Sequence, residues 1–541
     1  MRVSRLLASV VCVVSGLMLP ANSFGGAPTS QPSSVPTSVP ARAAAGVEHL
    51  GEEPEDWPEV AGAGEASPQK ASARLVDWRA STRLVTTTDL KHESDGGFRE
   101  DVATLNWTLA LEAAAALPAG LTFRAGACLR LHLSWKGGGG DRLHRSDFEV
   151  LPSESYVGWK RGSFEARLGM QTIVWGESDL VNPLDVLAPR DLRLGLLTEP
   201  EALRLPTLAL SLRGRLFSTS ISLVWAPIFT PHRVDLFGGD FAVLGPGAPA
   251  ALRRLGGALE GLVDDTVEGA LQEALVQTEL PRPVVGSDLG LRIARSLGGV
   301  DLAAQYVYTH QRLPAMTLHQ SVLPSLAPLL AATEQQIDAG ALSPLLATLL
   351  SAEGMEQRYP RRHVVGASVS RALGRFVATL DVAYGTRQLE PLASGGLLGL
   401  PLVDGGDGWF HTTVDTSSLA YTLGLRHNEG EQLLLVLEWW HELLLDELAK
   451  PSRERLPLLL GGPQRGGLAA LMRFSRGDVS GQLLMHSEVF FGSLVVTPEL
   501  SYRFGEHAIL GAGCNLFVGR RGIGALYEAN DQAYVFLRGD L

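Results

Sequence analysis

The feature that most constrains the fold is strict alternation over fifteen residues, "LTFRAGACLRLHLSW", at 121–135. Every odd position from Leu121 to Trp135 is apolar, whereas the even positions include Arg124, Arg130 and His132. Successive side chains of a β-strand point to opposite faces, so the segment predicts a strand with one apolar and one charged face. A strand of this length is long for a soluble sheet.

The same period recurs along the chain and predicts about 18 strands. A soluble β-sandwich also alternates, so the period alone leaves that alternative open. The predicted strands are 73–88, 101–112, 121–135, 148–160, 163–175, 205–213, 216–226, 286–296, 299–310, 363–372, 375–386, 415–427, 431–442, 466–476, 479–490, 494–504, 507–518 and 530–541.

The lengths of the connections decide between the two folds. Connections after even-numbered strands are tight, such as "RG" at 161, "LGG" at 297 and "GEH" at 505, whereas 176–204 and 227–285 are long. Short turns at one rim and long loops at the other are typical of bacterial outer-membrane barrels. We therefore predict an all-β membrane protein, an antiparallel transmembrane β-barrel of about 16–18 strands with periplasmic turns and extracellular loops.

The N-terminal region predicts export. Residues 1–23 carry two arginines, an apolar run and small residues before the expected cleavage point, which is the pattern of a signal peptide. Residues 24–70 are rich in Pro, Ser, Ala and Glu and predict a disordered linker, which leaves 71–541 for the barrel. The expected location is the outer membrane of a Gram-negative bacterium. The formal net charge is −12, whereas a nucleic-acid-binding protein carries a basic surface, so the sequence argues against binding of nucleic acid.

Strings that resemble catalytic motifs lack a required residue. In "WWHELLLDE" the position four after His441 is Leu445, so the helical zinc pair is absent, and "GASVS" at 366 lacks the final glycine of a nucleophile elbow. The sequence thus predicts neither an enzyme nor a metal site or cofactor.

The stretch "RLGMQTIVWGESDLVNPLDVLAPRDLR" at 167–193 allows two interpretations. It forms a rim, with Trp175 as an interface aromatic and Pro183 in a turn, or it folds inward and narrows the pore. The second hypothesis gives a ligand or constriction set, and the alternation gives lumenal charges. The constriction set is Arg167, Gln171, Trp175, Glu177, Asn182, Asp185 and Arg190, and the lumenal charges are Arg124, Arg130 and His132.

This stretch resembles the hallmark of a family of uncharacterised Gram-negative outer-membrane proteins. In that family a glycine, a glutamine and a Trp-Gly-Glu-Ser sequence precede an Asn-Pro-x-Asp element. The matching residues are Gly169, Gln171, Trp175, Gly176, Glu177, Ser178, Asn182, Pro183 and Asp185. The resemblance implies a large barrel that is often found alongside export machinery or lipid and sterol metabolism, and it implies no catalytic residues.

Two long insertions between predicted strands are relevant to the kind of ligand that the barrel binds. Leucines and valines recur at helical spacing in 249–278 and in 321–352, which predicts helices in external loops. They either pack on each other as a cap or line the way in for an apolar ligand.

The expected function is an outer-membrane channel or transport barrel for an apolar or amphipathic small molecule. The alternative is a structural or binding barrel that conducts nothing. Expected partners are outer-membrane lipid, a small-molecule ligand and the barrel-insertion machinery, and no nucleic acid.

Overall fold

The structure is a computed structural model that describes eleven main parts of the chain and three single residues between them, all within the compact unit Gly46–Leu541. The predicted signal peptide 1–23, the linker 24–70, the insertion 249–278 and 325–352 of the second insertion lie outside the described residues. The described residues are 76–90, 101–136, 142–193, 200–234, 241, 280–322, 324, 355–392, 403–404, 409–430, 432–452, 458, 462–528 and 530–540.

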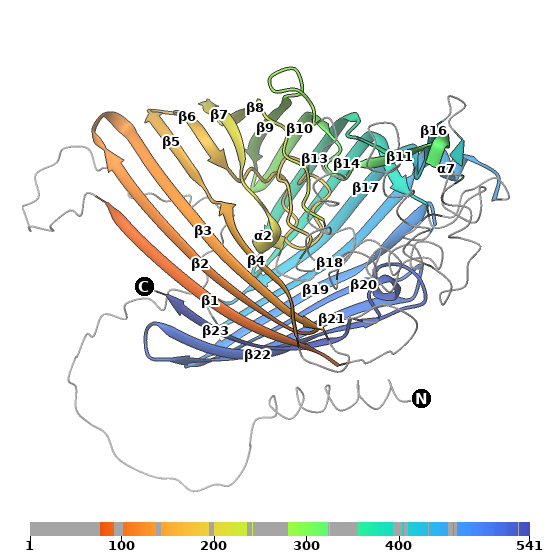
Figure 1. The fold of residues 1–541 in the computed structure, drawn as a ribbon. Helices are drawn as coiled ribbons and strands as arrows, with labels where there is room; N and C mark the ends of the chain where they lie inside the picture. Colours follow the sequence, from red (N-terminus) through yellow and green to blue (C-terminus); the bar gives the residue numbers. More distant parts are fainter. Residues whose placement is uncertain are drawn as a thin grey trace, which may run out of the picture. The chain divides into compact units, whose positions relative to one another are not determined.

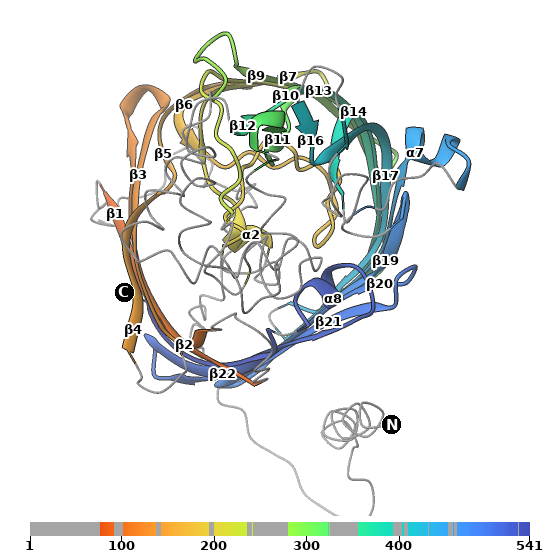
Figure 2. The same ribbon diagram turned by 45° about the vertical axis from the view of Figure 1, so that its right-hand side comes forward.

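The wall is a closed ring of antiparallel strands (Figure 1, Figure 2). The sheet contains 19 strands, but β4 and β5 both pair with β3 and share one place, so the ring has 18 places. The ring closes where β23 pairs with β1. Its strands are β1 (Asp77–Asp89), β2 (Asp101–Leu117), β3 (Leu121–Lys136), β4 (Arg142–Pro152), β5 (Ser155–Arg161), β6 (Phe164–Gln171), β7 (Thr207–Leu216), β8 (Thr219–Ala226), β9 (Asp288–Leu297), β10 (Val300–His310), β13 (Arg361–Leu373), β14 (Phe376–Pro391), β17 (Thr413–Asn428), β18 (Leu433–Leu444), β19 (Gln464–Arg476), β20 (Val479–Glu488), β21 (Ser493–Phe504), β22 (Ala508–Val518) and β23 (Gln532–Asp540).

The two rims differ as the connection lengths predicted. Tight turns join β5 to β6, β7 to β8, β9 to β10 and β13 to β14 at one rim. Longer segments join β6 to β7, β8 to β9 and β10 to β13 at the other. Each ring strand pairs only with strands that neighbour it in this order, so the fold is an up-and-down barrel and the predicted fold class is confirmed. The sandwich alternative is wrong.

The outer face of the wall is apolar and exposed. Leu111 on β2, Leu168 on β6, Leu437 on β18 and Leu537 on β23 expose between 41% and 59% of their surface, although they come from strands all around the ring. A soluble protein rarely leaves so many large apolar side chains open. A bilayer removes that cost, because the surface faces lipid and all ladder hydrogen bonds are made within the ring.

Smaller elements occupy the long connections. Strands β11 (Ala315–His319), β12 (Met355–Arg358), β15 (Val403–Asp404) and β16 (Trp409–His411) form a four-stranded sheet, which the sequence did not predict. The remaining described helices are η1 (Pro118–Gly120), α2 (Pro200–Leu203), η2 (Gln320–Val322), α7 (Leu445–Ala449) and α8 (Ile523–Leu526). Among the described residues no helix is long and apolar enough to cross a membrane.

Several strands differ from their predicted bounds by four to six residues, and two of them lie next to the stretch 167–193. The predicted strand 148–160 is two strands in the structure, because the strand breaks after Pro152, and β4 begins six residues before the predicted start, at Arg142. The predicted strand 163–175 ends early, at Gln171, because the chain there turns away from the wall.

The assignment of β2 side chains to the lipid face and the lumenal face can be tested by mutation. Leu111 points outward and Ala110, its neighbour in the chain, points into the lumen on the same face as Glu112. Leu111→Arg should cost roughly 2–4 kcal/mol, as an arginine on the lipid face near the bilayer middle does, whereas Ala110→Arg should cost far less. Urea titration of heat-modifiable folded protein measures both. Equal losses would contradict the assignment of faces.

Candidate functional site

The described residues between β6 and β7, 172–193 and 200–206, fold into the barrel, and we name them the inner loop. Figure 2 shows its short helix α2 within the ring of strands. Gln171 fixes the point of departure, because its Oε1 accepts a hydrogen bond from Ser211 Oγ at 2.6 Å and its Nε2 donates to the Ala209 carbonyl at 2.7 Å. With 5% of its surface exposed, Gln171 ties the last position of β6 to β7.

A carboxylate on β14 binds the first turn of the inner loop. The backbone amides of Glu177 and Ser178 donate to the carboxylate of Asp381 at 2.8–3.2 Å. Asp381 has no exposed surface. Its register partners are Ser368 and Thr422, whose side chains also belong to the lumenal face.

A second carboxylate, on β18, binds the next three amides. Residues 179–181 donate to the carboxylate of Glu438 at 2.6–3.2 Å, and the Val181 carbonyl accepts from Thr422 Oγ1 at 2.8 Å. Glu438 is 1% exposed. Strands β7, β8, β9, β10, β13, β14 and β17 stand between β6 and β18, so the loop reaches a wall nearly opposite its origin.

Five consecutive amides, 177–181, therefore meet two buried carboxylates, and we name them the amide run. A buried N–H without an acceptor and a buried carboxylate without donors are each costly, and here each satisfies the other. Hydrogen bonds to an ionised acceptor are also stronger than neutral ones. The amide run thus holds this part of the inner loop to strands far around the ring from β6.

A glycine makes the turn that starts the amide run. Gly176 has a φ of 112°, and a Cβ built on it would lie 2.3 Å from Asn182 Oδ1. That oxygen accepts a hydrogen bond from the Leu184 amide at 2.9 Å. Any side chain at 176 would collide with the asparagine that shapes the end of the turn.

The apolar underside of the inner loop packs on the inner face of the wall. Trp175, Leu184 and Leu187 are at most 6% exposed and share a cluster with wall residues. Glycines make room, since a Cβ at Gly290 would lie 2.6 Å from the Trp175 ring and one at Gly366 would lie 2.1 Å from a Leu184 methyl. The wall residues are Ala209, Val224, Ala226, Val307, Val364 and Ala383. The hypothesis of Trp175 as an interface aromatic is therefore wrong.

Buried ion pairs hold the middle of the inner loop. The Asp185 side chain, fully buried, accepts from Arg190 at 3.0 Å and from Arg204 at 2.8 Å. Arg312, which is 5% exposed, donates to the Leu187 carbonyl at 2.5 Å and pairs with Asp288 of β9 at 3.0 Å. Apart from Arg190, whose side chain is 32% exposed, these groups lie away from water and act as structural partners.

The far arm of the inner loop reaches β3 and β4. Asp191 pairs with Arg130 at 2.8 Å and with Arg193 at 2.9 Å, and Arg193 also pairs with Glu149 at 2.6 Å. Burial opposes ionisation of Asp191, but hydrogen bonds and charge from Arg193 and Arg130 outweigh it and lower the pKa of Asp191 to about 2. This arm therefore stays charged and bound over a wide pH range.

The Glu177 side chain is the half-open carboxylate of the stretch. It pairs with Arg292 of β9 at 2.9 Å, and 31% of the side chain is exposed. Burial raises the pKa of Glu177 despite Arg292, and the nearby charges of Asp381, Asp301 and Asp179 raise it further. Of the predicted constriction set, this carboxylate is the one that water reaches.

Three predicted site residues lie on the wall with other partners. Arg167 pairs with Glu165 at 2.6 Å. Arg124 pairs with Glu112 and Glu154 at 3.0 and 2.9 Å, and His132 Nδ1 lies 2.6 Å from Asn106 Oδ1. The inner loop brings together Gln171, Trp175, Glu177, Asn182, Asp185, Arg190 and, from β3, Arg130.

The sequence interpretation missed four residues that bind the inner loop: Asp381, Glu438 and Arg292 on the wall, and Arg312 just after β10. The one available signal was a charged residue at a lumenal position of an otherwise apolar strand, as in "TLDVAY" and "VLEWW". Among the described residues no group of three or more His, Cys, Asp or Glu side chains is placed to hold a metal ion.

Comparison with known families gives a match over most of the barrel. The family model described as "Protein of unknown function (DUF1302)" matches residues 98–467, which is more than half of the chain and includes the whole stretch 167–193. A search of curated proteins finds no match.

Several solved structures are distantly similar. The Acinetobacter baumannii OccAB4 structure has a TM-score of 0.41 and 7% identity, with 86% of this chain and 98% of that chain covered. The Salmonella typhi OmpF complex with daunomycin has a TM-score of 0.35 and 8% identity, with coverages of 86% and 97%. The E1M, A116K mutant of Rh. blastica porin has a TM-score of 0.30 and 12% identity, with coverages of 86% and 100%. At these scores we base no conclusion on them.

The amide run generates a test by hydrogen exchange. Glu438→Gln turns one acceptor oxygen into a donor, so at least one of the charge-assisted bonds, each contributing about 1.5–3 kcal/mol, is lost. Exchange of the amides 179–181 in the folded barrel should accelerate by about tenfold or more. Glu112→Gln is the control, since Glu112 pairs with Arg124 on the wall. Equal protection in both variants would show that Glu438 does not hold the loop.

Proposed function

We propose that this chain, which belongs to the family described as "Protein of unknown function (DUF1302)", is an outer-membrane channel whose lumen the inner loop narrows. One observation carries the proposal: the amide run is bound to Asp381 and Glu438, on strands far around the ring from β6. A loop held at both walls obstructs the lumen at a defined place, as a constriction must.

The membrane location rests on the wall itself. Large apolar side chains cover the outer face around the ring, and the strands close on themselves without an end strand. That combination satisfies the backbone in lipid, where neither an open sheet edge nor an unpaired amide is tolerated. We take the rim with tight turns as periplasmic.

Side chains on the lumenal wall away from the inner loop favour an amphipathic molecule as the transported solute. Described residues of the inner loop contact strands from β3 round to β20, whereas Arg83, Glu499, Tyr534 and Phe536 lie on β1, β21 and β23. Tyr534 donates to Glu499 at 3.0 Å, and the Arg83 guanidinium lies 4.8 Å from the Phe536 ring. Charged and aromatic groups thus face the lumen side by side, which suits a molecule with polar and apolar parts.

The motif is explained by the fold of the inner loop. Gly169, with a φ of 144°, leaves no room for a Cβ beside the Ser155 carbonyl, which would lie 2.3 Å away. Gln171 anchors the strand end, Trp175 packs on the wall, and Gly176 and Asn182 shape the turn. We infer that members of the family carry this motif together with a loop folded into the barrel.

A second candidate function follows from the same contacts. A loop bound to walls on both sides could close the lumen entirely, and the protein would then be a binding or structural barrel that conducts nothing.

Single-channel recording in planar bilayers separates the two functions. We expect the wild-type protein to give discrete conductance steps, and the double variant Asp381→Asn, Glu438→Gln to give larger ones, because the loop loses both of its wall carboxylates. The control Glu112→Gln should match the wild type. If neither the wild type nor the released variant conducts, the channel proposal is wrong and the binding barrel is favoured.

The pH dependence of selectivity tests the role of Glu177. Its raised pKa means that it becomes neutral at a higher pH than an ordinary glutamate, so preference for cations should be present at neutral pH and fall on acidification. Reversal potentials in a salt gradient follow this titration. Glu177→Gln should abolish it while the protein stays folded. A titration that persists in Glu177→Gln would assign the selectivity to another group.

A further inference from the structure

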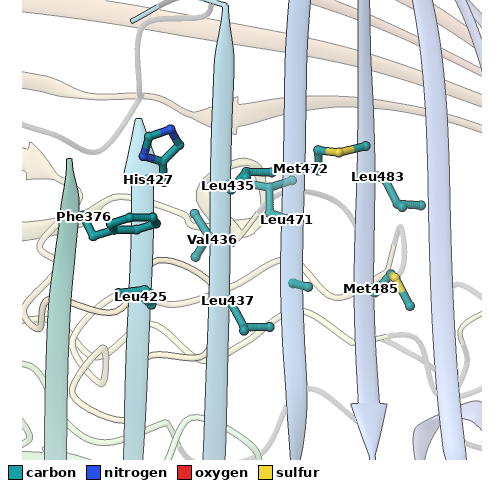
Figure 3. Close-up of a pocket in the computed structure, with 11 residues that line it drawn as sticks. Phe376, Leu425, His427, Leu435, Val436, Leu437, Leu471, Met472, Leu483 and Met485 are labelled. Carbon is teal, nitrogen blue, oxygen red and sulfur yellow. The ribbon is translucent and has the colours of Figure 1, made fainter. Parts of the chain in front are cut away.

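A shallow depression of about 280 Å³ lies on the outer face of the wall, over β14, β17, β18, β19 and β20 (Figure 3). The strand register arranges its side chains in two rows across the strands. One row is Leu425, Leu437, Ala470 and Met485, and the other is Phe376, His427, Leu435, Met472 and Leu483. Apart from His427, both rows are apolar.

The hollow arises from a small residue among large ones. Ala470 pairs with Leu437 on one side and Met485 on the other, so the floor is lowest at β19. The neighbours Leu437, Leu425 and Phe376 expose 50%, 42% and 43% of their surface, so the depression opens outward, away from the lumen. Two methionines in its lining can adapt to the shape of a flexible ligand.

The depression ends at exposed arginines at the rim with tight turns, where the exposed Glu429 and Asp478 also lie. Along the outward face of β19, Met472 is followed by Phe474 and then by Arg476 at the end of the strand. On β14, Phe376 directly follows Arg375, whose side chain is 80% exposed and only 3.7 Å from the exposed Glu429. Arg476 and the outward Arg371 of β13 are exposed and have no ion-pair partner among the described residues.

Apolar side chains that lead to exposed arginines match the two parts of a phospholipid. An acyl chain fits an outward apolar trough, whereas the phosphate needs cations at the level of the headgroups. An exposed pair such as Arg375–Glu429 is weak, so the arginine is available to a phosphate. The rim with tight turns is the one we assign to the periplasmic leaflet, which consists of phospholipid.

We propose that this depression binds one anionic phospholipid, with an acyl chain over Ala470 and the phosphate at Arg375 and Arg476. The site shares the membrane location of the proposed function but does not depend on conduction. The lipid occupies the outer wall and has no access to the inner loop.

Native mass spectrometry of the full chain in mild detergent tests the proposal. After delipidation, phosphatidylglycerol is titrated back and compared with phosphatidylcholine. We expect one tightly bound phosphatidylglycerol. Ala470→Phe should abolish its binding by filling the hollow. Arg375→Gln and Arg476→Gln should each weaken it by roughly fivefold, as the loss of one arginine near an anionic headgroup predicts.

Matched controls lie elsewhere on the outer face. The first control is Ala166→Phe on β6, where Ala166 faces outward between Trp159 and Leu212. The second is Arg161→Gln, which removes an exposed arginine at the end of β5. Both controls should keep wild-type binding. If Ala470→Phe fails to fold, as judged by heat modifiability, Ala470→Leu replaces it.

Three results would overturn the proposal. Equal loss of lipid in site and control variants would mean that lipid binds non-specifically around the whole barrel and that the depression is not a specific site. Equal affinity for phosphatidylcholine would remove the role of the arginines. A dimer or trimer that Ala470→Phe dissociates, with no lipid bound, would show that a second copy of the chain covers the depression.

Discussion

The structure depends on one constraint: a backbone N–H that has lost water must find an acceptor within the protein. In the wall the constraint is met by closing the ring, where β23 pairs with β1 and leaves no end strand. Inside the lumen it is met by side chains, because the amide run 177–181 has no neighbouring strand. Asp381 and Glu438 supply the acceptors, so one requirement shapes both the barrel and the loop within it.

Most of the wall could be predicted from the sequence, because the information for a membrane strand is local. Alternation along 121–135 assigns both faces of β3 without reference to any other strand, and the tight turns then fix which strands are neighbours. The prediction failed where the pattern continued but the environment changed. Residues 172–175 still read as strand, yet the chain leaves the wall after Gln171.

The site could be predicted only in part, because its partners are remote. The motif pointed to the segment that folds inward and to Glu177 and Gln171 within it. The residues that bind it, Asp381 and Glu438, lie more than 200 residues away along the chain. No sequence pattern near them indicates that they contact the loop. The glycines Gly290 and Gly366, which accept Trp175 and Leu184, look like ordinary strand residues until the loop is placed on them.

The central claim is that the inner loop sets the limiting cross-section of the barrel. The most direct measurement is the size of the largest polyethylene glycol that enters the pore, determined from its effect on single-channel conductance. The wild type is compared with a variant in which a short glycine-serine turn joins Gln171 directly to Thr207. The account predicts that the loop-free barrel admits clearly larger polymers than the wild type. The same size limit in both folded proteins would contradict it.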